Sequence, residues 1–78
     1  MKLTEQRLVR YLEESLDLED VEADSELFSS GWLDSVSMLE LIAFVEREAG
    51  IEVTPDDVTL ANFDTVSRML RFATGRAA

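Results

Sequence analysis

The chain contains no cysteine and no histidine. Its 78 residues are near the lower limit for a domain that folds unaided, because a chain this short buries only about 60% of the surface that its unfolded form exposes. Small domains often compensate with disulfide bonds or a structural metal, but thiolate and imidazole ligands are lacking here. The core must therefore come from packed apolar side chains, and we expect one domain over residues 1–78.

The same two missing residue types limit the chemistry. Without histidine or cysteine there is no nucleophile–base pair of the usual kinds and no proton shuttle that works near neutral pH. Carboxylates still offer acid and base groups, but they need a pocket that shifts their pKa values, and a small bundle has little room for one. We expect no enzymatic activity from this chain alone.

The net charge is −10, from 17 acidic and 7 basic residues. Such a surface repels nucleic acid and anionic membranes, and it speeds encounter with proteins that carry basic patches. The N-terminus has no apolar run typical of a signal peptide, and the longest apolar stretch, residues 41–45, is too short to span a bilayer. We expect a soluble, cytoplasmic monomer that binds neither nucleic acid nor membrane.

Apolar spacing predicts two helices in the first two thirds of the chain. Thr4 is placed to cap a helix over 5–16, in which leucine and tyrosine recur every three or four residues. Asp34 is placed to cap a second helix over 35–49, and Gly50 is the residue expected just beyond its end.

The remaining segments are shorter. Residues 51–53 alternate like a strand but have no partner strand, so we expect an extended connector. A short helix is predicted over 56–62, and Asp64 is placed to cap a final helix over 65–73. Residues 74–78 are expected to fray. The fold class is thus all-α, with three longer helices and a short one.

A long segment over 17–34 separates the first two helices and begins with six acidic residues in ten positions. Loops of this length in compact domains tend to be functional. The acidic residues lack the spacing of a calcium-binding loop, so they indicate a solvated acidic surface, and we expect no metal site.

The loop ends in a short motif, Gly-Trp-Leu-Asp-Ser, at residues 31–35. A purely structural interpretation is coherent: Gly31 makes a turn, Trp32 and Leu33 anchor the loop, and Asp34 caps the helix. Ser35 is then only a tolerated residue of the first turn. On these residues alone the functional interpretation of Ser35 stays open.

The helix over 35–49 has two apolar faces. A core face is formed by Met38, Leu41, Ile42, Val45 and Ala49. A second, smaller stripe is formed by Val36, Leu39 and Ala43, with Glu40 and Arg47 at its border. An apolar stripe rimmed by charge indicates a docking surface, unless the first helix or the long loop covers it. Phe44 belongs to neither face.

Over nearly its whole length the chain resembles the acyl carrier and peptidyl carrier proteins. The resemblance is carried by Leu27-Phe28, by the Gly-Trp-Leu-Asp-Ser string, by the start of the helix at Ser35, and by residues 46–51 and 62–66. It implies a four-helix carrier bundle with one short helix and a long loop between the first two.

The resemblance also implies a modified serine. In that family a phosphopantetheinyl transferase moves 4′-phosphopantetheine from coenzyme A to the serine after the aspartate, which is Ser35 here. A helix N-terminus suits such a phosphodiester, because it offers free N–H donors and the positive end of the helix dipole. Partner enzymes of the family grip this helix, which assigns docking to Asp34, Val36, Leu39, Glu40, Ala43 and Glu46.

Two departures narrow the role that the resemblance implies. Ser37 stands where fatty-acid carriers commonly have an acidic residue, and Arg47 interrupts their acidic run. The motif is more similar to that of free-standing carriers fed by adenylating enzymes. We therefore expect a carrier of acyl or aminoacyl thioesters in a natural-product or related secondary pathway, served by an adenylating or acyl-loading enzyme and by downstream synthases or transferases.

Two alternatives use the same residues differently. An acidic helical module that binds a partner helix without being modified would use the same apolar stripe. A small hydrolase built on Ser35 would need a histidine or a G-x-S-x-G elbow, and the chain has neither.

Overall fold

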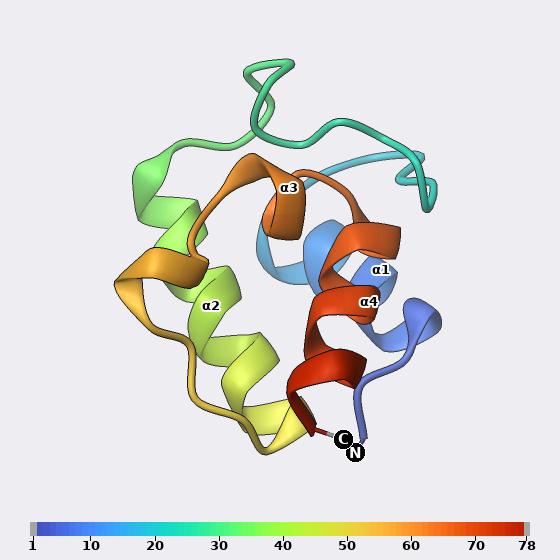
Figure 1. Cartoon of the computed structure of the whole chain (residues 1–78). Helices are drawn as coiled ribbons and strands as arrows, with labels where there is room; N and C mark the ends of the chain where they lie inside the picture. The colour runs from blue at the N-terminus through green and yellow to red at the C-terminus, as the bar shows by residue number, and fades with distance from the viewer. Residues whose placement is uncertain (1, 78) are drawn as a thin grey trace.

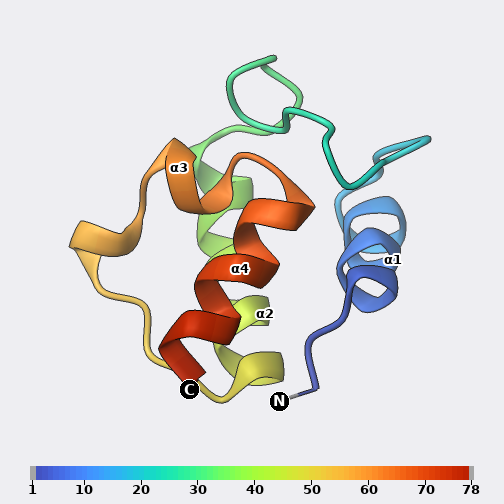
Figure 2. The same cartoon turned by 45° about the vertical axis from the view of Figure 1, so that its right-hand side comes forward.

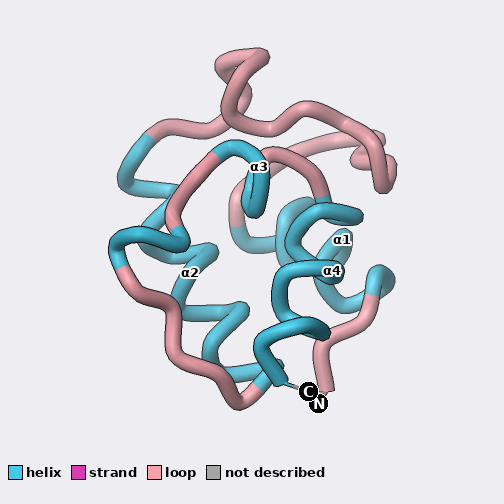
Figure 3. Tube along the Cα trace, viewed as in Figure 1, coloured by secondary structure: helices cyan, strands magenta, loops and turns pink. Residues whose placement is uncertain are grey.

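The computed structural model describes residues 2–77. Its longer helices are α1 (Glu5–Ser15), α2 (Ser35–Ala49) and α4 (Val66–Ala77), and its shorter ones are the 3-10 helix η1 (Pro55–Asp57) and α3 (Leu60–Phe63). Over the described range the chain is helix and loop without strand, as Figure 3 shows. The predicted all-α fold, with three longer helices and a long loop between the first two, is confirmed.

The first two helices begin and end where local signals placed them. The Thr4 hydroxyl accepts a hydrogen bond from the Arg7 N–H at 3.1 Å, and α1 ends within one residue of its predicted boundary. The Asp34 carboxylate accepts the Ser37 N–H at 2.9 Å. At the other end of α2, Gly50 adopts the left-handed conformation with φ 67°, which lets the next N–H reach back to the last turn.

Helix α4 packs against α1, α2 and α3 and is the centre of the bundle (Figures 1 and 2). The core combines apolar residues from every longer helix with Val21, Leu27 and Leu33 from the long loop. Thus the loop crosses one end of the bundle but is anchored to its interior (Figure 1).

Aromatic stacking joins α1 to α2. The rings of Tyr11 and Phe44 lie 4.1 Å apart and nearly parallel, and the Arg47 guanidinium lies 5.6 Å from the centre of the Phe44 ring. Phe44 is buried, with 7% of its surface exposed. This contact accounts for the residue that the helical periodicity left unplaced.

The short helix predicted over 56–62 is wrong in its details, because the segment forms two pieces. Two threonines start separate turns. At η1 the Thr54 N–H and hydroxyl both donate to the Asp57 carboxylate at 2.9 Å, and at α3 the Thr59 hydroxyl accepts the Asn62 N–H at 3.3 Å. Each turn is thus closed by its own side-chain contacts, so the two pieces do not merge.

The predicted cap and end of the final helix are also wrong, although its start agrees to within one residue. The Thr65 hydroxyl caps α4 by accepting the Arg68 N–H at 3.0 Å, while the Asp64 carboxylate is directed at the long loop. The helix continues to Ala77 because Arg76 donates to the Glu52 carbonyl at 2.9 Å and to the Asp57 carboxylate at 2.7 Å. Of the predicted frayed tail, residues 74–77 are helical, and residue 78 lies outside the described part.

Neither a membrane-spanning helix nor a metal-binding cluster occurs among residues 2–77. No helix there is long and apolar enough to cross a bilayer. The acidic segment between α1 and α2 brings no three ligand-type side chains into a metal-binding group within that range.

Candidate functional site

Ser35 is the first residue of α2 and is exposed to solvent. The residue before it, Asp34, closes the N-terminal end of the helix with its carboxylate. Hydrogen bonding from the Ser37 backbone is the main cause that holds the pKa of Asp34 below its usual value of 3.8, so this carboxylate is charged at neutral pH. A hydroxyl and a fixed negative charge therefore stand side by side at the start of the helix.

This arrangement modifies one expectation about the helix end. The Ser37 N–H is one of the donors that an unoccupied helix N-terminus offers to a phosphate, and here it is already bonded to Asp34. A group attached to Ser35 would meet the helix dipole and a negative side chain together. The serine is placed more for access than for tight capture of an anion.

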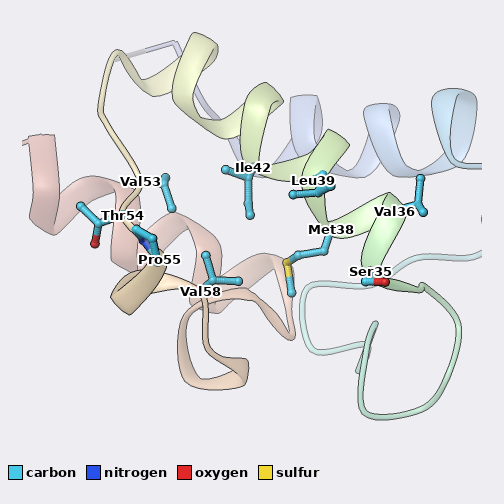
Figure 4. Close-up of a pocket in the computed structure, with 9 residues that line it drawn as sticks. All are labelled: Ser35, Val36, Met38, Leu39, Ile42, Val53, Thr54, Pro55 and Val58. Atoms are coloured by element: carbon cyan, nitrogen blue, oxygen red, sulfur yellow. The ribbon is translucent and has the colours of Figure 1, made fainter.

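An apolar groove of about 700 Å³ starts at Ser35 and runs along α2. One wall is formed by Met38, Leu39 and Ile42, and the facing wall comes from the connector, residues 53–58, as Figure 4 shows. Along α2 the groove extends from Ser35 to Ile42, a rise of about 10 Å along the helix. Its lining residues include no charged side chain.

The groove corrects the predicted core face of α2. Met38 and Ile42 were assigned to the core, but both are only half-buried and line the groove. The connector 53–58 lies opposite them as a separate wall without filling the space (Figure 4). Leu41, Val45 and Ala49 are buried as expected, and Phe44 joins them.

The second apolar stripe of α2 is uncovered. Val36 is 64% exposed and Leu39 is 69% exposed. Ala43, about one turn after Leu39 in α2, is exposed too. Neither α1 nor the long loop covers this stripe. The alternative in which it is simply buried by the rest of the chain is therefore wrong.

The acidic residues assigned to docking fall into two groups. Asp34 and Glu40 are exposed beside the stripe. Glu46 is half-buried, and its carboxylate accepts the Val53 N–H at 2.9 Å, which ties the connector to α2. Glu46 thus has a structural task in addition to any contact with a partner.

Three apolar residues are exposed although the sequence did not predict it, one of them aromatic and two aliphatic. Trp32 was expected to anchor the loop, but 48% of it is exposed, and Leu33 alone is buried. Val58 and Leu60 are also exposed apolar residues. No local pattern predicts their exposure, because it depends on how the segment after α2 folds against the rest of the chain.

Comparison with known proteins gives the family. A family model described as the phosphopantetheine attachment site matches residues 6–73. No curated protein matches the chain. Since the match covers most of the chain, the fold and the site define a phosphopantetheine-bearing carrier.

The chain belongs to the phosphopantetheine attachment-site family and is an acyl or peptidyl carrier protein. Proteins of this class hold 4′-phosphopantetheine covalently on a serine and are generally non-catalytic. They interact with a modifying transferase and with the enzymes that load and use the carried group. Ser35 has room for such a group, because its exposed hydroxyl opens onto the groove.

Proposed function

We propose that Ser35 is the attachment residue, and that the chain carries acyl or aminoacyl thioesters for a natural-product or related secondary pathway. The observation that supports this most is the position of Ser35: an exposed hydroxyl after Asp34, at the first residue of α2 and at the mouth of an apolar groove. The family match favours this role over that of an unmodified interaction module.

The chain's own residues prepare the site rather than perform the chemistry. The attached group supplies a thiol when it is bound. Because the protein has no cysteine, no thiol of the chain competes for the cargo. Asp34 fixes the start of α2, which holds the Ser35 hydroxyl outward where a transferase reaches it.

The outer face of α2 supports docking of partner enzymes. Val36, Leu39 and Ala43 offer exposed apolar contacts, and Asp34 and Glu40 add negative charge at the edge. A partner with a basic rim around an apolar patch complements this face. Trp32 lies three residues before Ser35 in the chain and extends the apolar contact from the helix into the loop.

Intact-mass measurement tests the attachment residue. The purified protein is incubated with coenzyme A and a phosphopantetheinyl transferase of broad specificity, and the site is then located by peptide mapping. We expect one added group on wild type, none on Ser35→Ala, and one on the matched control Ser37→Ala, which alters a serine two residues further along the same helix. Modification of Ser35→Ala would refute the assignment.

The class of pathway requires a separate experiment on the modified protein. It is offered to adenylating enzymes with amino acid or aryl acid substrates, and in parallel to a malonyl transferase of fatty acid synthesis. Ser37 and Arg47 leave α2 less acidic than that transferase's usual carriers, so we expect efficient loading by the adenylating enzymes and poor malonylation. The opposite preference would place the protein in fatty acid synthesis.

A further inference from the structure

The segment that leads into Ser35 has no regular secondary structure, so something else must fix it. Between Leu27 and Leu33 the chain makes a closed loop, in which the Leu33 N–H donates to the Leu27 carbonyl at 2.9 Å. Both leucines are buried, and the residue after Leu33 is the helix cap Asp34. Where the base of this loop sits therefore sets where Asp34 and Ser35 begin α2.

The base of the loop is held by Asp64, at the junction of α3 and α4. One carboxylate oxygen of Asp64 accepts the N–H groups of Phe28 at 2.8 Å and Ser29 at 3.0 Å, and the other accepts the Ser29 hydroxyl at 2.6 Å. The Asp64 carbonyl accepts the Leu27 N–H at 2.8 Å. In Figure 1 the loop and the α3–α4 connection lie at the same end of the bundle.

The surroundings of Asp64 indicate that these bonds are strong. The residue is only 2% exposed, and a buried carboxylate is tolerated only when its oxygens are well bonded. The Arg68 guanidinium lies 3.8 Å away and supplies a positive charge. Burial favours the neutral form, but the hydrogen bonds from Ser29 and Phe28 outweigh it and keep the pKa of Asp64 below its usual value.

We propose that Asp64 is a positioning residue for the modification of Ser35: it holds the base of the loop so that Trp32, Asp34 and Ser35 meet the transferase in one arrangement. The proposal rests on the proposed function of Ser35. Without Asp64 the loop must be ordered when the transferase binds, and that ordering opposes association. The loss therefore affects KM more than kcat.

The test compares two largely buried carboxylates that bond to other parts of the chain. Glu48 lies near the C-terminal end of α2, where it accepts a hydrogen bond from Arg7 of α1, and its side chain is 10% exposed. It lies outside both the loop and the groove, so Glu48→Ala is the matched control. Modification kinetics are measured well below the melting temperature of each variant. We expect kcat/KM to fall about ten- to a hundred-fold in Asp64→Ala, mainly through KM, and to stay near wild type in Glu48→Ala.

Two further variants keep the test decisive if Asp64→Ala folds poorly. Asp64→Asn retains an oxygen for the two N–H donors and should recover kcat/KM to within about threefold of wild type, because bonding to a neutral oxygen is weaker but persists. Ser29→Ala removes a single bond and should cost a few-fold. Wild-type kinetics in folded Asp64→Ala, or an equal loss in Glu48→Ala, would overturn the proposal.

Amide hydrogen exchange separates this proposal from the assignment of Ser35. In Asp64→Ala we expect the amides of Phe28, Ser29 and Leu33 to lose protection while those of α4 keep it. If exchange changes in this way but wild type carries its group on another serine, the proposed function of Ser35 fails, and Asp64 holds the loop for a purely structural reason. If protection is unchanged, Asp64 does not hold the loop.

Discussion

Leu39 and Leu41 offer a direct test of the two faces of α2, since they are the same residue type two positions apart on one helix. Leu39 is 69% exposed and Leu41 is fully buried. Truncating a buried leucine to alanine costs about 2–5 kcal/mol, whereas an exposed one changes stability by roughly 0.5 kcal/mol or less. A chain of this size has about 4–12 kcal/mol in total, so Leu41→Ala removes a large share.

The functional effects should have the reverse order. An apolar residue at the centre of an interface typically costs more than about 1 kcal/mol on truncation, so Leu39→Ala should lower the kcat/KM of the transferase about tenfold. Leu41→Ala should lower the melting temperature by about 10 °C or more and leave the folded protein a normal substrate. Thermal unfolding and modification kinetics give both quantities. If Leu39→Ala melted as early as Leu41→Ala, or were modified at the wild-type rate, the stripe would not be a docking surface.

Three other predictions follow from local features. Gly50→Ala should destabilise the protein by about 1 kcal/mol because φ there is 67°, although the added carbon would have no steric clash with residues beyond its chain neighbours. Gly75→Ala, inside α4, should stabilise it by about 0.5 kcal/mol in the same melting assay. Hydrogen bonding from Arg76 is the main cause that lowers the pKa of Asp57 from 3.8 to about 2. The stabilising effect of this carboxylate is therefore fully present above pH 3.8 and is lost as the pH falls from 3.8 to about 2. Over that interval the melting temperature of Asp57→Asn should depend less on pH than that of wild type. Trp32 is the single tryptophan, so its fluorescence should shift when a partner binds. Titrations that follow this shift should show weaker binding at 1 M salt, where charges are screened beyond about 3 Å. Unchanged emission on binding would show that Trp32 lies outside the interface.

The parts of the fold that the sequence predicted well depend on local signals. The boundaries of α1 and α2 agree with prediction because Thr4, Asp34 and Gly50 act on backbone groups within a few residues of themselves. Asp64 carries the same local signal as Asp34, but its carboxylate bonds to Ser29, which is 35 positions away in the chain. The Asp64 carboxylate bonds to this distant loop instead of capping α4, and no local pattern in the sequence indicates that partner.

In the candidate site, too, the features set by local sequence were predicted and those set by distant contacts were not. The motif identified Ser35 as a candidate, and helical periodicity found the exposed stripe of Val36 and Leu39. The groove could not be predicted, because its second wall is the connector 53–58 and its position depends on the Glu46–Val53 and Asp57–Arg76 contacts. Phe44 was unplaced for a similar reason: only the ring of Tyr11 on another helix explains its burial.

The negative charge of the chain opposes the self-association that its exposed apolar surface would otherwise favour. A small protein that leaves Val36, Leu39 and Trp32 in solvent presents apolar surface to every other copy of itself. Every copy also carries a net charge of −10, so two identical stripes repel each other through their acidic surroundings. A partner with a basic rim meets the same stripe with attraction instead. If α2 is the docking surface as proposed, its charge favours partners with a basic rim over other copies of the same chain.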